Sequence, residues 1–190
     1  MVHLDMTTRA PLLKSFVTAF LLGTSSAGAV EHDDELDALF AGLANPEMSE
    51  TGQIENRIYE IWSQSGSPAM DLILERGQRA LAEGDAKTSI DHFSALIDHA
   101  PNFAEAYNGR ATAWFQLGKY GLSLEDIART VDLNPRHFGA LSGLALILEE
   151  LGNKPGALEA WRRVQALHPT REGMDDAMQR LEREVEGETL

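Results

Sequence analysis

The sequence predicts an all-α protein: a helical-hairpin solenoid of three repeat units with an N-terminal helix pair and a C-terminal capping helix. Three prolines stand 34 residues apart, at Pro101, Pro135 and Pro169. Three glycines keep the same spacing, each about midway between prolines, at Gly84, Gly118 and Gly152. A fixed period of this length indicates stacked repeats, in which each unit is a small supersecondary element.

Apolar and small residues fall in the same register in all three units. The aligned columns are Ile73, Tyr107 and Leu141; Gly77, Ala111 and Ala145; Ala80, Trp114 and Leu148; Ile90, Leu124 and Leu158; and Phe93, Ile127 and Trp161. We expect the column of small residues, Gly77, Ala111 and Ala145, to let paired helices approach closely. Trp114 and Trp161 are expected to fill the gaps between pairs. One helix pair cannot bury its own apolar face, whereas three pairs with covers can.

The composition narrows the classes of function. The chain has 190 residues, a formal net charge of -14 and a pI near 4.7, so nucleic-acid phosphates and an anionic membrane surface would repel it. It contains no cysteine, which excludes disulfides, a thiolate nucleophile, and cysteine-ligated zinc or iron–sulfur sites. We therefore expect no cofactor, no resident metal and no nucleic-acid partner.

Residues 1–29 have the pattern of a secretory signal peptide. Arg9 and Lys14 form a basic region, residues 15–22 an apolar region, and residues 27–29 (Ala-Gly-Ala) a cleavage site. The alternative is an uncleaved membrane anchor, but the apolar run is far shorter than the roughly 20 residues that a spanning helix needs. The pattern predicts export, to a bacterial periplasm or to the medium, with no stable membrane insertion after cleavage.

Residues 30–67 are predicted to be an acidic segment followed by an atypical helix pair. The acidic run 31–35 contains His32 and admits a divalent-metal site as an alternative. Acids are also favoured in a first helical turn, and we expect Asp33 or Asp34 to be the N-cap.

The two helices of this pair each carry one apolar face. The first has the stripe Leu36, Leu39, Phe40 and Leu43. The second, from about residue 50 to residue 65, carries Ile54, Ile58, Ile61 and Trp62. The sequence leaves open whether residues 33–65 cap the stack or occupy its groove.

The three repeats are expected at 68–101, 102–135 and 136–169, each as helix, tight turn, helix. Ser67 suits the N-cap of the first, and Pro68 fits the first helical position, where its missing N–H is no loss. In the middle unit, Asn102 and Glu105 have the spacing of a capping box.

The helix ends of the middle unit follow from its turn residues. The first helix ends near Leu117, and Gly118 provides the backbone conformation of the turn. The second helix is expected from about Tyr120 to Leu133, because the residue before Pro135 avoids the helical region.

Residues 170–190 are predicted to form a capping helix and a tail. The helix, from about residue 170 to residue 186, has charged residues on its outer side. Its inner apolar stripe is Met174, Ala177, Met178, Leu181 and Val185. A stack whose last open face is hydrophobic needs a cover with one polar side, and this helix suits that role.

The histidines raise the question of catalysis or metal binding. We expect His99, which aligns with Leu133 and Leu167, to be a partly buried packing residue, and His168 to be a turn residue. The sequence has no nucleophile elbow, phosphate-binding glycine loop or His-Glu-x-x-His motif. The prediction is therefore a non-enzyme, with a small metal-binding or accessory enzyme that uses the histidines as the alternative.

Two arginines occupy one column of the repeats. Arg76 and Arg110 align with Leu144 of the third unit. We expect each to form an ion pair with its partner helix, Arg76 with Asp91 or the neighbours of His92, and Arg110 with Glu125 or Asp126. A ligand clamp is the alternative.

These motifs together resemble the tetratricopeptide repeat family. The middle unit carries Tyr107, Arg110, Ala111 and Trp114, followed by Gly118, Tyr120, Ser123, Ile127 and Pro135. The third unit carries Leu141, Leu144, Ala145 and Leu148, followed by Gly152, Ala157, Trp161 and Pro169. The first unit is the loosest match, with Gly77, Ala80, Gly84, Phe93 and Pro101. The resemblance covers about residues 70–170, and the family also has an extra C-terminal helix.

The resemblance implies a ligand site on the concave face, lined by the first helix of each pair. The corresponding positions are Leu74, Gln78, Leu81, Glu105, Asn108, Thr112, Phe115, Gln116, Ser142, Leu146 and Glu149. Some family members hold the C-terminal carboxylate of a peptide with lysine, arginine and asparagine. Here the matching residues are Leu74, Gln78, Gly109, Gly139 and Gly143, so that carboxylate clamp is absent.

The predicted function is that of a non-catalytic protein-interaction module, a scaffold or adaptor in the cell envelope. Its partner would be a protein or peptide segment that lies in the groove, with Phe115 as the apolar anchor, since central aromatic residues dominate many interfaces. A self-associating module, in which the groove or the N-terminal helix pair contacts a second copy, is the other alternative. The sequence does not identify the partner or the pathway.

Overall fold

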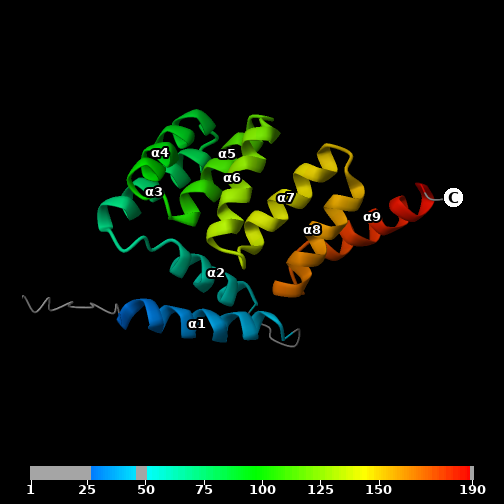
Figure 1. The fold of residues 1–190 in the computed structure, drawn as a ribbon, viewed down its shortest axis with the longest axis horizontal. Coiled ribbons are helices and arrows are strands. Elements are labelled where there is room, and N and C mark those ends of the chain that lie inside the picture. The colour runs from blue at the N-terminus through cyan, green and yellow to red at the C-terminus, as the bar shows by residue number, and fades with distance from the viewer. Residues whose placement is uncertain (1–26, 46–50, 189–190) are drawn as a thin grey trace, which may run out of the picture.

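The computed structural model describes residues 27–45 and 51–188, and within these ranges the protein is entirely helical (Figure 1). The helices are α1 (Ala27–Leu43), α2 (Thr51–Trp62), α3 (Pro68–Ala82), α4 (Ala86–His99), α5 (Ala104–Gln116), α6 (Tyr120–Leu133), α7 (Phe138–Glu150), α8 (Lys154–Leu167) and α9 (Met174–Glu188). The prediction of an all-α solenoid is confirmed.

The hairpins α3–α4, α5–α6 and α7–α8 stack in chain order, as Figure 1 shows. Equivalent glycines allow the tight turn within each hairpin: Gly84, Gly118 and Gly152 have φ angles of +81°, +66° and +73°, a region that costs other residues strain. The middle repeat has the predicted α6 bounds, Tyr120–Leu133.

Small residues bring the helices of each hairpin into close contact. Ser89 Oγ donates to the carbonyl of Gly77 (3.0 Å), and Ser123 Oγ donates to the carbonyl of Ala111 (2.7 Å). The same hydrogen bond between paired helices therefore occurs in each of the first two repeats. The Phe93 ring is fully buried against Gly77, where an added Cβ would lie 2.6 Å from its Cε1 atom. The expected role of the small column is confirmed.

The two repeat tryptophans differ. Trp161 is buried in the largest apolar cluster, as predicted. Trp114 is only half-buried and lies outside the apolar clusters formed by the described residues. The gap-filling role predicted for Trp114 is therefore wrong.

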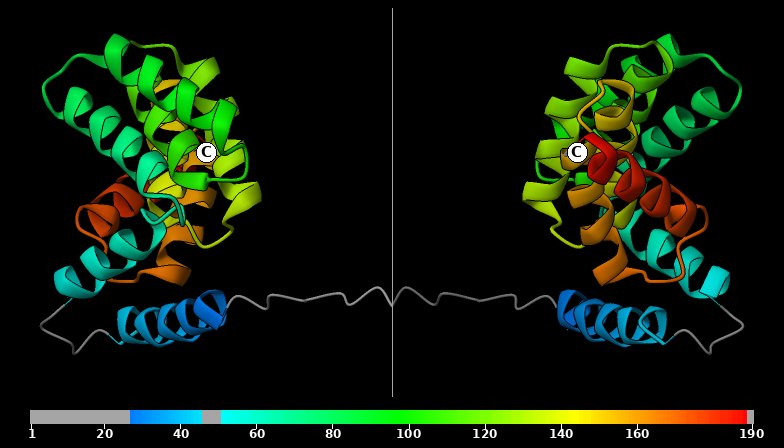
Figure 2. Two further views of the ribbon diagram at one scale, coloured as in Figure 1. Left: turned by 90° about the vertical axis from the view of Figure 1, so that its left-hand side faces the viewer. Right: turned by 90° about the vertical axis from the view of Figure 1, so that its right-hand side faces the viewer.

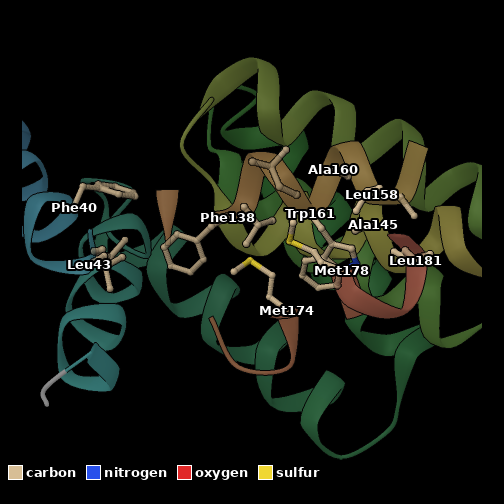
Figure 3. Close-up of a cluster of buried hydrophobic side chains, with 14 of the residues drawn as sticks. Phe40, Leu43, Phe138, Ala145, Leu158, Ala160, Trp161, Met174, Met178 and Leu181 are labelled. Atoms are coloured by element: carbon tan, nitrogen blue, oxygen red, sulfur yellow. The ribbon is translucent and has the colours of Figure 1, made fainter. Parts of the chain in front are cut away.

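The N-terminal pair α1–α2 packs on the third repeat, far along the sequence, rather than on α3 (Figures 1 and 2). Figure 3 shows Phe40 and Leu43 of α1 on the side of Phe138, the first residue of α7. The rings of Phe40 and Phe138 are 6.2 Å apart, and those of Trp62 and Phe138 are 5.3 Å apart. The apolar stripes predicted for both helices face this cluster.

The starts of helices α1 and α5 differ from the sequence expectations. Helix α1 is already formed at Ala27, so Asp33 and Asp34 lie inside it and neither is an N-cap; alanine, the strongest helix former, precedes them. The capping box is also wrong, because Phe103 is the N-cap of α5 and the Glu105 carboxylate turns into the core. Ser67 is the N-cap of α3 but makes no side-chain cap bond.

The C-terminal helix α9 covers the third repeat, as predicted, but it begins at Met174 rather than near residue 170. Met174, Met178 and Leu181 are buried against α8 and α7, where Figure 3 shows them beside Trp161. Most of the predicted signal peptide, residues 1–26, lies outside the described residues. None of the helices in the described ranges is long and apolar enough to span a membrane.

Candidate functional site

A cavity of about 280 Å³ opens between α5 and α7, the first helices of the second and third hairpins. Its lining includes five of the positions predicted for partner binding: Asn108, Thr112, Phe115, Ser142 and Leu146. Ile127 of α6 and Ala111, Ala140 and Ile147 contribute apolar surface. The structure therefore brings the central part of the predicted site together.

The remaining predicted positions do not line this cavity. Leu74 and Glu105 are 2% and 5% exposed, so they belong to the packing of the fold rather than to a free surface. Glu149 lines a neighbouring cavity and accepts hydrogen bonds from Trp161 Nε1 (2.9 Å) and Arg180 (2.7 Å). Gln78 and Gln116 are exposed and Leu81 is half-buried, all outside the cavity.

The hydroxyl groups of the cavity are already engaged. Thr112 Oγ1 donates to the carbonyl of Asn108 (3.0 Å), and Ser142 Oγ donates to the carbonyl of Phe138 (2.8 Å). The Asn108 amide makes only a long contact, 3.5 Å, with Glu105. Of these polar side chains, Asn108 retains the most capacity to bind a ligand's backbone.

The apolar part of the cavity includes the ring of Phe115 and the exposed side chain of Leu146. Phe115 packs against Tyr120, with ring centroids 5.6 Å apart. Leu146 on α7 is 44% exposed, among the most exposed large apolar side chains of the described residues. An apolar side chain of a ligand would cover both.

At two of the five carboxylate-clamp positions, Gly109 and Gly139, other side chains fill the space that a larger residue would need. A Cβ on Gly109 would collide with the Phe93 ring, and a Cβ on Gly139 would lie 2.6 Å from the Tyr59 hydroxyl. Neither position can carry a lysine or arginine without displacing an aromatic residue. This packing accounts for the absence of a basic side chain at these two positions.

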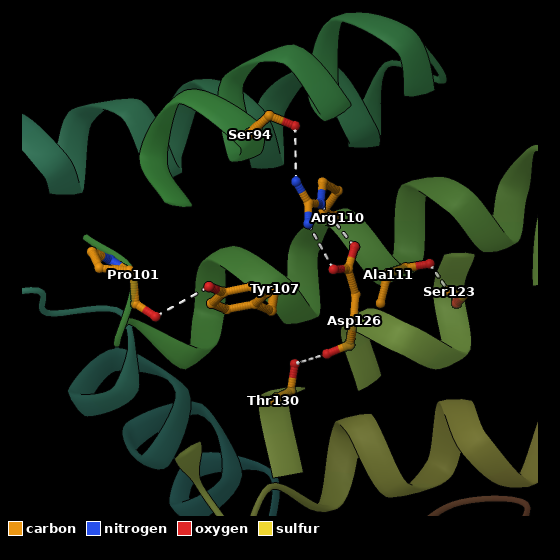
Figure 4. Close-up of polar contacts among 8 residues, drawn as sticks. All are labelled: Ser94, Pro101, Tyr107, Arg110, Ala111, Ser123, Asp126 and Thr130. Carbon is orange, nitrogen blue, oxygen red and sulfur yellow. Dashed lines mark hydrogen bonds and ion pairs between the residues drawn. The ribbon is translucent and has the colours of Figure 1, made fainter. Parts of the chain in front are cut away.

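Arg110 forms the predicted ion pair with the partner helix. Its Nε donates to Oδ2 of Asp126 and its Nη2 to Oδ1, both at 2.8 Å, and Nη1 donates to Ser94 (3.1 Å). Figure 4 shows these contacts. The hydrogen bonds to Asp126 raise the pKa of Arg110. Arg76 is exposed, and the contacts of the described residues include no pair between it and Asp91, so that part of the expectation is wrong.

His137 joins the second and third repeats and packs on the N-terminal pair, a role that the sequence did not reveal. His137 is fully buried, with Nε2 2.7 Å from Glu105 Oε1 and its ring stacked on Trp62 at 4.5 Å. Its only sequence signal is its place just before α7, the N-cap position, where Nδ1 accepts from the N–H of Ala140.

A separate polar cluster around Glu55 joins α2 to the end of the third repeat. Glu55 contacts Nε2 of His168 (3.1 Å) with one oxygen and Nη1 of Arg171 with the other. The guanidinium of Arg171 also lies over the Phe138 ring, 5.4 Å from its centroid. Burial raises the pKa of nearby Tyr59 to about 12.

The histidines differ from their predicted environments. His168 follows α8 in a turn, as expected, but it is buried at 1% exposure. His99 is exposed rather than partly buried, because the cluster that covers its equivalent Leu167 does not extend to the first repeat. Among residues 27–45 and 51–188, no group of histidines and acids is arranged to hold a metal ion.

Comparison with known proteins places the repeats among tetratricopeptide repeats. A sequence model of that family, described as "Tetratricopeptide repeat", matches residues 74–129 and 116–172. A TPR repeat-containing protein of Rhizobium etli is 36% identical over 135 residues, covering 70% of this chain and 66% of the relative. The small glutamine-rich tetratricopeptide repeat-containing protein 2 of Saccharomyces cerevisiae is 28% identical, over 79% of this chain and 42% of that protein. The match thus spans less than two thirds of each relative's length.

Solved structures with the same fold include two tetratricopeptide domains. The first such domain of Spaghetti (RPAP3), bound to the HSP90 peptide SRMEEVD, has a TM-score of 0.59 and 22% identity, covering 61% of this chain and 92% of that domain. The Sgt2 domain from Aspergillus fumigatus has a TM-score of 0.60 and 22% identity, covering 65% and 83%. At this identity the likeness concerns the fold.

Proposed function

The chain belongs to the tetratricopeptide repeat family, and from this premise we propose that it is a non-catalytic protein-interaction module that binds a partner segment in its concave groove. The observation that carries the proposal is the cavity between α5 and α7, lined by Asn108, Phe115 and Leu146. Ligand sites combine apolar walls with a few polar groups that fix orientation, and this cavity has that composition.

The position of the N-terminal pair favours this function over self-association through that pair. Helices α1 and α2 bury their apolar stripes on the third repeat of their own chain. These apolar stripes are therefore not free to contact a second copy. The groove, in contrast, keeps Leu146 exposed.

The test is partner capture with tagged protein, residues 30–190, beside an Asn108→Ala/Phe115→Ala variant. We expect a partner that is retained by the wild type and lost by the variant while its helical content is unchanged. Retention of the same partner by both proteins would contradict binding in the groove, as would the absence of any specific partner.

We also propose that the protein works in the cell envelope, which rests on the pattern of residues 1–29. The test is to express the full chain with a C-terminal reporter and to determine the N-terminal residue of the product. Cleavage after Ala29 and recovery from the envelope fraction are expected. An intact N-terminus in the cytoplasmic fraction would refute export without affecting the groove.

A further inference from the structure

The charge around the groove is concentrated at one residue. Among the described residues that line the cavity between α5 and α7, Arg171 is the single charged side chain. It comes from the turn between α8 and α9, outside the repeat helices, and it also lines the adjoining cavity along α9. A ligand in the groove would therefore have apolar surface on one side and one guanidinium at its end.

Arg171 is held in place from the side of the N-terminal pair. Glu55 of α2 accepts from Nη1 of Arg171 with Oε1, while its Oε2 contacts His168. Glu55 is therefore not bidentate on Arg171. A guanidinium has five N–H donors, and the Arg171 side chain is 25% exposed, so it can still reach a second carboxylate.

The surrounding charges favour approach of such a carboxylate from the side of Phe115. No acidic side chain is among the described residues of the cavity between α5 and α7. The adjoining cavity carries three acids, Glu149, Glu172 and Asp176, which balance its three arginines, Arg171, Arg180 and Arg183, so it has no excess of positive charge. Arginine suits this recognition because its planar fork matches a carboxylate.

We propose that Arg171 is a binding residue of the groove, and that the partner segment carries a carboxylate next to the apolar side chain that packs on Phe115 and Leu146. This inference rests on the proposed function and adds the chemistry of the ligand. Glu55 of α2 contacts the same guanidinium, so it would compete with the carboxylate of the partner. An acidic side chain or a C-terminal carboxylate would supply the same group.

The test begins with a random peptide library displayed on phage and selected on the full chain. Peptides that bind the wild type but not a Leu146→Arg variant are defined as groove ligands. Each groove ligand is then synthesised again with one acidic residue changed to its amide, or with an amidated C-terminus. We expect the groove ligands to share an apolar residue beside a carboxylate. The amide form that weakens binding about tenfold or more identifies which carboxylate is used.

Two substitutions break the same ion pair and separate recognition from folding. Arg171→Gln removes the binding group, and we expect about tenfold or more loss of affinity for the selected peptide. Glu55→Gln removes a competing carboxylate and keeps the guanidinium, so affinity should be unchanged or higher. Arg183→Gln, an exposed arginine of the adjoining cavity, is the charge-matched control and should have no effect.

If Arg171→Gln and Glu55→Gln lost the same amount of affinity for the peptide, Arg171 would act only by attaching α2. That result would overturn the inference. Groove ligands without a carboxylate, bound equally by Arg171→Gln, would overturn it too, while the proposed function would stand. A selection that yields no groove ligand would contradict both.

Discussion

The Nε2 atom of His137 lies 2.7 Å from Oε1 of Glu105, which is one repeat earlier in the chain, and both side chains are buried. Because Nδ1 of His137 accepts from the N–H of Ala140 (3.0 Å), the ring proton is on Nε2 and is donated to Glu105. One histidine thereby caps α7 and satisfies a buried carboxylate. It also supports Trp62 of the N-terminal pair.

Replacing His137 should destabilise the whole domain. In His137→Ala the cap is lost and the Glu105 carboxylate is left without its partner, so the free energy of unfolding should fall by about 2–4 kcal/mol. His137→Asn keeps a cap acceptor and should recover part of the loss. Urea unfolding measures both, with the exposed His99→Ala as the control. A change within about 0.5 kcal/mol for His137→Ala would contradict this account.

Gly109 should be intolerant of a single methyl group. An added Cβ would collide with the Phe93 ring, and overpacking of this kind costs about 1–3 kcal/mol. Gly121→Ala, where nothing lies within 4 Å, is the matched control and should be neutral or stabilising, by up to about 1 kcal/mol.

Relief of that collision supplies a second check on the same contact. Phe93→Leu should cost less in the Gly109→Ala background than in the wild type, because the smaller side chain makes room for the methyl group. Strictly additive free energies of unfolding would show that the two residues do not compete for space.

Tyr59 should make the domain sensitive to alkaline pH. Burial raises its pKa from 10.0 to about 12, so between these values the unfolded chain has lost the phenolic proton while the folded one retains it. Stability from this group is complete below pH 10 and declines as pH rises towards 12, by about 2–3 kcal/mol. Denaturant unfolding from pH 9 to 12 should show a steeper decline for the wild type than for Tyr59→Phe. Parallel curves would refute the assignment.

The repeats could be predicted from the sequence because the residues that determine each hairpin lie close together in the chain and recur in all three units. Proline and glycine at fixed spacing set the hairpins, and Gly77, Ala111 and Ala145 identified the packing column. The predictions for Trp114 and His99 were wrong because the repeats differ in which other side chains pack over these two positions. A periodic pattern carries no information about such differences between units.

The attachment of the N-terminal pair could not be predicted in the same way. The contacts of Glu55 with His168 and Arg171 join residues more than a hundred positions apart, and no local pattern signals them. The apolar stripes of α1 and α2 indicated that the pair is buried, but not against which repeat. The position of Arg171 in the lining of the cavity between α5 and α7 was missed too, because Arg171 lies beyond the third repeat.

The central claim, that the concave groove binds a partner, is tested most directly by placing a photo-cross-linking amino acid at Leu146 or at Leu122 in the intact protein. The two leucines are 44% and 43% exposed, but only Leu146 lines the cavity. We predict a specific cross-linked partner from Leu146 and none from Leu122. The same product from both sites, or a partner captured only at Leu122, would contradict the claim.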